Sequence, residues 1–224
     1  MIYITGDTHI PIDIKKLNTK NFPEQKTLTK EDYVIICGDF GGVWNGKNEE
    51  KYWINWLKNK NFTTLFVDGN HENFDMLKNF EIADLLGGKV QKIDDGIFHL
   101  MRGEVYNIDK KKIFAFGGAK SHDKKYRTEG ISWWKEEIPS AEEYENARKN
   151  LEKNGRKVDY IITHCAPGFI NSGIFHYEND GINDFLDEIS NKIDFKKWFF
   201  GHYHDDKNIN EKYTCVFDEI ITIE

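Results

Sequence analysis

Cysteines that could form a disulfide framework and prolines that could form a linker are both scarce in this chain of 224 residues. Its three cysteines, Cys37, Cys165 and Cys215, are odd in number and form no Cys-x-x-Cys pair. That spacing excludes a disulfide-rich scaffold and favours a reduced chain in the cytoplasm. There are four prolines, and no repeat or low-complexity tract interrupts the sequence. We therefore expect a single domain that spans residues 1–224.

Long hydrophobic runs and an excess of positive charge are also missing. No apolar run approaches the ~20 residues that a membrane-spanning helix needs. The first residues show neither the basic flank nor the cleavage site of a signal peptide. The formal net charge of -7 argues against a broad basic surface for nucleic acid or anionic lipid. We therefore expect no membrane or nucleic-acid partner. The composition does not tell a monomer from an oligomer.

The sequence alternates between strand-like and helix-like segments. Six β-branched or aromatic runs predict buried strands at residues 2–5, 33–37, 63–67, 112–116, 159–163 and 197–200. Apolar periodicity predicts helices at residues 48–60, 140–154 and 182–190, and the second opens on a Ser-x-x-Glu capping box. Residues 87–116 predict antiparallel hairpins, and residues 213–223 predict two more strands. This order predicts an α/β (or α+β) sandwich with mixed sheets.

Side chains of the kind that bind metals follow five of the predicted strands. In chain order these candidates are Asp7, His9, Asp39, Asn70, His71, Glu72, His164, His202 and His204. The carboxyl ends of strands are where α/β sheets build their sites. Because residues two apart in an extended segment point the same way, Asp7 and His9 can converge on one ion. Oxygen and imidazole donors without thiolate suit Mn, Fe, Zn, Co or Ni. The other histidines, His99, His122 and His176, are interpreted as structural.

Along the chain these residues form the motifs Asp-x-His, Gly-Asp, Gly-Asn-His-Glu, a lone His and Gly-His-x-His. Their types and order closely resemble the calcineurin-like metallophosphoesterase superfamily. The resemblance implies a four-layer αββα sandwich, two mixed β-sheets flanked by helices, with two divalent transition-metal ions at the strand ends and manganese favoured. The implied ligands are Asp7, His9 and His204 for one metal, Asn70, His164 and His202 for the other, and Asp39 as the bridge.

The resemblance also implies a hydrolytic mechanism. Two metals ~3.5–4 Å apart lower the pKa of a bridging water, and the resulting hydroxide attacks the phosphorus of a monoester or diester in line. Asp39 and His71 are then the catalytic residues, with His71 as the general acid that protonates the leaving oxygen. The alternative for His71 is a histidine that only positions the phosphate.

The chain departs from the protein-phosphatase branch of that superfamily. Val43 and Asp68 stand where that branch has its two phosphate-binding arginines. Gly42 stands where that branch has the aspartate that pairs with the catalytic histidine. Glu72, in contrast, matches the glutamate that follows this histidine in the branch. A phosphoprotein substrate is therefore compatible with the sequence, but close kinship to that branch is not indicated.

Two further features are candidates for substrate contacts. Arg127 lies in the loop of residues 119–138, where its guanidinium can grip a phosphate oxygen bidentately. The alternative is an exposed polar loop. Asn70 is the second candidate for substrate binding. Trp44 and the pair Trp133 and Trp134 are candidates for a wall against a nucleoside or aryl group. Since neighbours on a strand face opposite ways, at least one of the pair is expected in the core, and the sequence singles out no stacking platform.

The sequence therefore predicts a metal-dependent phosphoesterase that acts on a phosphate ester of a small molecule, a nucleotide or a phosphoprotein. It does not distinguish a monoester from a diester. A nuclease is one alternative, but it would want a basic groove that the charge balance does not indicate. The other is a catalytically silent scaffold that binds proteins. Such a scaffold is expected to have lost ligands, whereas all the motif positions are filled here.

Overall fold

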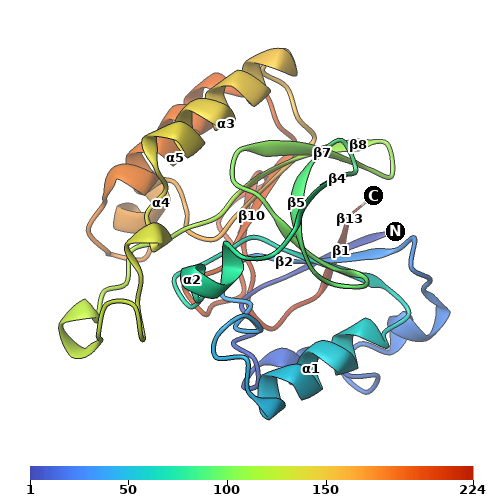
Figure 1. Ribbon diagram of the computed structural model, residues 1–224. Helices are drawn as coiled ribbons and strands as arrows, with labels where there is room; N and C mark the ends of the chain where they lie inside the picture. The colour runs from blue at the N-terminus through green and yellow to red at the C-terminus, as the bar shows by residue number, and fades with distance from the viewer. Residues whose placement is uncertain (224) are drawn as a thin grey trace.

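The computed structural model describes residues 1–223, which form two β-sheets packed face to face (Figure 1). Within these residues the first sheet has seven strands: β1 (Ile2–Thr5), β2 (Tyr33–Ile36), β3 (Thr63–Phe66), β4 (Ile82–Leu85), β5 (Gly88–Asp94), β6 (Ile97–Leu100) and β13 (Ile221–Ile223). The second sheet has six: β7 (Glu104–Ile108), β8 (Lys111–Phe116), β9 (Tyr160–Thr163), β10 (Lys197–Phe200), β11 (Lys207–Asn208) and β12 (Tyr213–Cys215).

Both sheets have a parallel centre and antiparallel edges. The first sheet has the order β13-β1-β2-β3-β6-β5-β4, in which the four strands from β1 to β6 are parallel. The second has the order β11-β12-β10-β9-β8-β7, in which the four strands from β12 to β8 are parallel. Because parallel strands end on the same side, the loops after β1, β2 and β3 share one edge, and those after β8, β9 and β10 share another.

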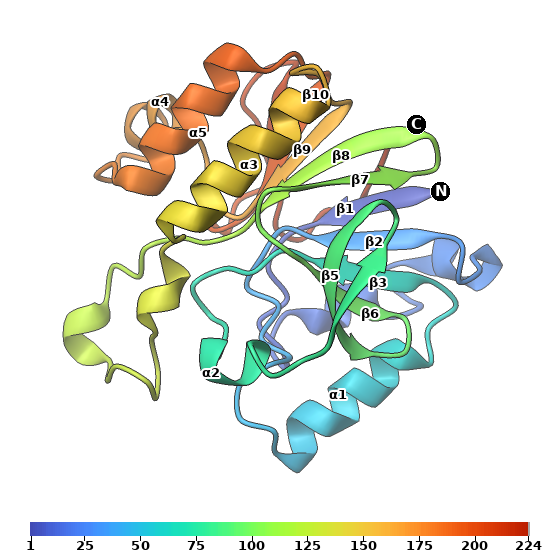
Figure 2. The same ribbon diagram turned by 45° about the horizontal axis from the view of Figure 1, so that its top comes forward.

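Helices cover the outer faces of the two sheets. The α-helices are α1 (Asn48–Lys58), α2 (Phe74–Leu77), α3 (Ala141–Lys153), α4 (Gly168–Gly173) and α5 (Gly181–Lys192). Short 3₁₀ helices occupy Ile14–Leu17, Pro23–Thr27, Lys124–Tyr126 and Lys135–Glu137. In Figure 2, α3, α4 and α5 lie together over the second sheet, and α1 lies on the far side of the first. The predicted four-layer αββα sandwich of two mixed sheets is confirmed.

Three apolar layers separate these four layers of secondary structure. Alternate residues of each strand face opposite ways, so each sheet can bury both of its faces. Between the sheets, Ile4 and Leu65 belong to the same buried cluster as Ile162 and Phe199. The outer cluster under α1 includes Leu57, Ile36 and Phe66. The outer cluster under α3 and α5 includes Leu151, Leu186, Phe116 and Ile161.

The predicted elements are confirmed, with small shifts at their ends. Each of the six predicted strands ends within one residue of the observed one, and each predicted helix within two. The capping box of α3 is formed, because Ser140 Oγ accepts from Glu143 N and Glu143 Oε2 accepts from Ser140 N. The short elements α2, α4 and β4 were not predicted. All three cysteines are buried and free, and within residues 1–223 no helix combines the length and apolarity needed to cross a membrane.

Candidate metal centre

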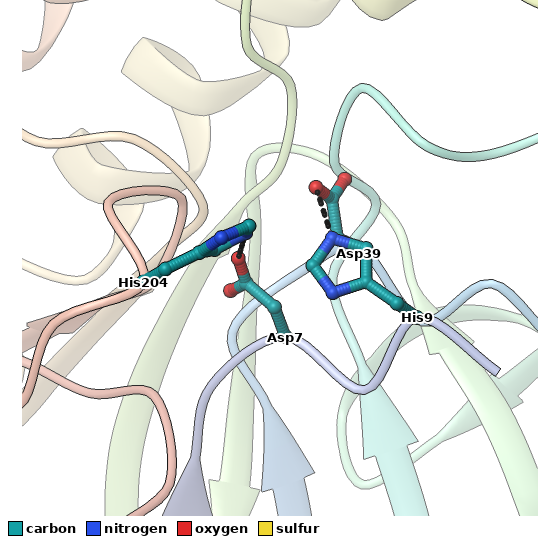
Figure 3. Close-up of side chains that lie close together, drawn as sticks. All are labelled: Asp7, His9, Asp39 and His204. Carbon is teal, nitrogen blue, oxygen red and sulfur yellow. Dashed lines mark hydrogen bonds and ion pairs between the residues drawn. The ribbon is translucent and has the colours of Figure 1, made fainter. Parts of the chain in front are cut away.

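Four of the predicted ligands meet just beyond β1 and β2. Asp7, His9, Asp39 and His204 offer ligand atoms that all lie within 4.8 Å of one another. Figure 3 shows these side chains converging above the strand ends. Asp7 Oδ2 lies 3.2 Å from His204 Nε2, and Asp39 Oδ2 lies 3.2 Å from His9 Nε2. Two carboxylates and two imidazoles at this spacing can hold a divalent transition metal.

A second group of predicted ligands adjoins the first and shares Asp39 with it. His164 Nε2 lies 3.3 Å from Asp39 Oδ1 and 3.3 Å from Asn70 Oδ1. The ring of His202 packs against that of His164, with 4.9 Å between the centroids. All seven predicted ligands are therefore brought to one place. Asp39 turns one carboxylate oxygen toward His9 and the other toward His164.

Hydrogen bonds fix the orientation of two of these imidazoles. His164 Nδ1 donates to the Cys37 carbonyl oxygen over 2.8 Å, and His9 Nδ1 donates to Asp13 Oδ2 over 2.9 Å. With Nδ1 occupied, both rings present Nε2 to Asp39. Partners of this kind set the tautomer and direction of metal-binding histidines. Asp13 had not been singled out in the sequence, where it is one of many aspartates.

Charge is concentrated in this buried place. Burial alone would raise the pKa of Asp7 and Asp39, but neighbouring histidines hold the pKa of Asp7 below its usual range and that of Asp39 well below it. At His164 burial is outweighed by the charge of Asp39, which raises the pKa to about 10. Burial and the charge of His164 lower the pKa of His202 to about 3. The raised pKa of His164 shows that its ring lies where nearby carboxylates favour positive charge. Such a place also suits a divalent cation, so the donor set fits a metal.

The backbone of the site is in an uncommon conformation. Four of its residues have left-handed φ angles: His9 (33°), Asp39 (45°), His202 (71°) and His204 (50°). Such angles are costly for residues other than glycine, and they cluster at functional sites. Two glycines are needed for close approach, because a Cβ on Gly69 would collide with Asp39 Oδ1 and one on Gly201 with Asp7 Oδ1. The loops therefore wrap tightly around the two carboxylates.

His71 and Arg127 meet at the border of the site. The loop that carries Arg127 leaves the end of β8 and is drawn yellow-green in Figure 1. Arg127 Nη2 donates to His71 Nε2 over 3.0 Å, and Arg127 Nε donates to Asp123 Oδ2 over 2.8 Å. His71 N donates to Asp39 Oδ1 over 2.8 Å. Burial lowers the pKa of His71, and the charge of Arg127 adds to that effect, while the charge of Asp39 opposes it. The loop thus brings the Arg127 guanidinium into contact with His71.

A network of buried charges lies beneath the turn that carries Asn70. Asp68, which replaces an arginine of the protein-phosphatase branch, accepts from Arg102 Nε over 2.9 Å and lies 3.0 Å from His99 Nε2. The Asp68 carbonyl oxygen accepts from Gly118 N, which ties the end of β3 to the end of β8. Arg102 holds the pKa of Asp68 well below its usual range against the effect of burial. The structural role predicted for His99 is thus confirmed.

Two residues near the site were not predicted to lie there. His122 had been interpreted as structural, but it is exposed, and its ring lies 5.8 Å from that of His202. The same ring stacks on that of Tyr177, with 4.7 Å between the centroids, so the contacts of His122 are packing contacts. Lys16 is buried, and its Nζ donates to the Asp7 carbonyl oxygen over 2.9 Å. Neither contact has a signal in the local sequence.

Comparison with known families decides between the possible uses of such a centre. A family model described as calcineurin-like phosphoesterase matches residues 1–206. The chain belongs to this phosphoesterase family. The matched range contains every candidate ligand from Asp7 to His204, and the family implies hydrolysis of phosphoester bonds with a pair of divalent metal ions. No match was found among curated proteins.

Proposed function

We propose that this phosphoesterase hydrolyses a phosphate monoester or diester at a centre of two divalent ions bridged by Asp39. The geometry of Asp39 is the observation that carries the proposal. Its Oδ2 lies 3.2 Å from His9 Nε2 and its Oδ1 lies 3.3 Å from His164 Nε2. One carboxylate therefore faces imidazoles from two separate strand ends, as a bridging ligand must.

The remaining donors divide into two sets around that bridge. One set lies beyond β1 and includes the exposed His204, and the other contains the buried His164. The proposed sets are Asp7, His9 and His204 for one ion and Asn70, His164 and His202 for the other. Nitrogen and oxygen donors without sulfur suit Mn, Fe, Zn, Co or Ni, and manganese is the ion we favour. When bound, such ions supply Lewis acidity that activates water and neutralises charge on phosphoryl oxygens.

We assign His71 and Arg127 to the organic and phosphoryl parts of the substrate, respectively. His71 is the proposed general acid for the leaving oxygen. Arg127 and the Asn70 amide are proposed to contact phosphoryl oxygens. Arg127 donates to His71 Nε2 in the free protein. Because Nε2 accepts from Arg127, it carries no proton in this arrangement. An anionic substrate that draws Arg127 onto a phosphoryl oxygen would free Nε2 to take up a proton from solvent, and His71 would then pass that proton to the leaving oxygen.

The substrate is a phosphate ester of a small molecule, a nucleotide or a phosphoprotein. The catalytically silent scaffold is the competing function, and it would have no need of the strained backbone and oriented imidazoles described above. Arg127 at the border of the centre supports the enzyme as well.

The test is hydrolysis of an aryl phosphate monoester and the matching diester, side by side, with Mn²⁺ and then with the other candidate ions. We expect turnover of at least one ester, and the preferred ester identifies the subclass. Asp39→Asn should abolish the activity, because an amide cannot bridge two cations as a carboxylate does. Asp84→Asn, an exposed aspartate on β4, is the matched control and should retain it. Absence of turnover with every ion, in protein that also binds no metal, would support the scaffold instead.

A further inference from the structure

An aromatic surface borders the proposed general acid. The ring of Trp44 lies 6.3 Å from that of His71, with 32° between the two planes. Trp44 is half-buried and lies in the loop after β2, two residues beyond Gly42. The ring also meets Trp134 edge to face, with 5.3 Å between the centroids and 81° between the planes. The half-buried ring of Trp44 therefore lies directly beside the proposed general acid.

Trp44 is held in place by several contacts. Its backbone N donates to Glu50 Oε2 over 2.9 Å, and its carbonyl oxygen accepts from Asn73 Nδ2 over 2.8 Å. Trp134 behind it is buried and donates from Nε1 to Asp75 Oδ2 over 2.9 Å. Within residues 1–223 the indole N–H of Trp44 has no hydrogen-bond partner. The backbone of Trp44 is therefore held on both sides, and its ring packs against a buried partner, so the ring loses little conformational entropy when a ligand packs on it.

We propose that Trp44 is a stacking platform for the leaving group, so that the substrate is an ester of an alcohol that carries a planar aromatic or heteroaromatic ring. This inference rests on the proposed function, because the position of His71 locates the leaving oxygen and hence the group attached to it. A flat π system can pack against an indole face in a way that a saturated ring of the same size cannot. The free indole N–H can donate to a heteroatom on that ring or its linker.

Two matched pairs of esters test the inference. Benzyl and cyclohexylmethyl phosphate share a primary alcohol and a six-membered ring, and differ in aromaticity. Adenosine 5′-monophosphate and ribose 5-phosphate are both esters of the 5-hydroxyl of a ribose, and only the first carries a base. For a diesterase the methyl diesters of the same alcohols are used. We expect kcat/KM to favour the member with the planar ring by roughly tenfold in each pair, the usual scale of one stacking contact.

Three variants show whether Trp44 causes the preference. Trp44→Leu should bring both ratios of kcat/KM close to one, whereas Trp44→Phe, which retains a ring, should keep part of the preference. Tyr52→Leu is the matched control, because Tyr52 is 61% exposed on α1 and touches none of the proposed site residues. It should leave both ratios unchanged. If Trp44→Leu removes the preference only in the nucleotide pair, the leaving group that stacks on Trp44 is a nucleoside. If it removes the preference only in the benzyl pair, that leaving group is a simple aryl alcohol.

Equal kcat/KM within both pairs would overturn the inference and leave the proposed function intact. So would a Trp44→Leu variant that slows all four esters by the same factor, since that result shows only a supporting contact to His71. If no ester is hydrolysed with any ion, the proposed function fails by itself. Calorimetric binding of adenosine 5′-monophosphate and ribose 5-phosphate in the presence of Mn²⁺ then decides the inference. Equal or absent binding of the two ligands would overturn it.

Discussion

Arg127 is the one arginine that contacts a proposed catalytic side chain among residues 1–223. Its Nη2 reaches His71 Nε2, and Asp123 holds its Nε. Both contacts use nitrogens of one planar guanidinium, so the group is already oriented at the border of the centre. In a chain whose net charge is -7, this fixed positive charge is a local feature and no part of a general basic surface.

At the residue scale we predict that Arg127→Ala lowers kcat/KM for phosphate esters by about 10–100-fold, the range expected for one lost hydrogen bond to a charged group. Arg127→Lys should recover part of that loss, because lysine restores the positive charge but cannot donate two parallel hydrogen bonds as a guanidinium does. Steady-state kinetics measure both effects. Arg148→Ala, on the outer helix α3, is the control and should match the unaltered protein. An unchanged kcat/KM for Arg127→Ala would remove this residue from substrate binding.

Residues that follow a strand could be recognised from the sequence, because a polar side chain directly after a buried run has few structural explanations. Asp7, Asp39 and His164 are of this kind. Lys16 and His122 could not be recognised, because each reaches the site across loops whose path is set by tertiary packing. Trp44 was one of three candidates for an aromatic wall, but the sequence could not choose among them for the same reason. A lysine in a polar stretch looks solvated until its Nζ is found against the Asp7 carbonyl oxygen. The site was thus predictable at its ligands and much less so at its border.

Helices α3 and α5 lie side by side over the second sheet and are joined by an ion pair. Arg148 Nη2 lies 2.7 Å from Glu188 Oε2, and Lys192 Nζ lies 3.0 Å from Glu188 Oε1. The hydrogen bond from Arg148 is the main cause that lowers the pKa of Glu188 to about 2. The pair lies at the surface, with Arg148 exposed and Glu188 half-buried, so solvent screening limits its net contribution to stability to about 0.2–1 kcal/mol.

At the element scale this pair predicts a stability difference that depends on pH. The pKa of Glu188 is lowered by folding, so its stabilising contribution is present above about pH 4.5 and is lost as the pH falls toward 2. Urea unfolding of the protein and of Glu188→Gln should therefore differ at pH 7 and converge near pH 2. High salt at pH 7 should also shrink the difference. A difference that stays constant between pH 7 and 3 would contradict the assignment.

Long elements were easier to predict than short ones for a physical reason. A strand buried on both faces and a helix with a capping box each have a local pattern that tertiary contacts only reinforce. The four residues of α2 form too few turns for an apolar stripe. The pairing of β6 with β3 is parallel, although β6 also belongs to an antiparallel hairpin with β5. Such a choice of neighbour depends on the whole sheet, so hairpins were predicted and the sheet order was not.

At the scale of the whole molecule, the centre joins the two sheets. Asp7, Asp39 and Asn70 follow strands of the first sheet, while His164, His202 and His204 follow strands of the second. The two sheets therefore meet here through carboxylates and imidazoles that come from both of them. A metal bound at this place would therefore contact both halves of the sandwich and stabilise the fold as a whole.

We predict that chelation lowers the melting temperature. Free Mn²⁺ at 100 times its Kd adds ~2.7 kcal/mol, which corresponds to a rise of about 5–10 °C for a chain of this size. Thermal unfolding with and without EDTA measures the shift. Asp39→Asn should lose most of it, and Asp84→Asn should retain it in full. A melting temperature that EDTA does not change, in protein purified with Mn²⁺, would argue against a metal at these residues.

The distance along the chain between ligands has a consequence for synthesis on the ribosome. Asp7 and His202 contact each other although 195 positions separate them. At ~5–20 residues per second, the first carboxylate leaves the ribosome about 10–40 s before its partner histidine does. During that interval Asp7, His9 and Asp39 form an incomplete set with little power to select among cations. A metal that needs ligands from both ends of the chain can therefore bind only after His202 and His204 have left the ribosome.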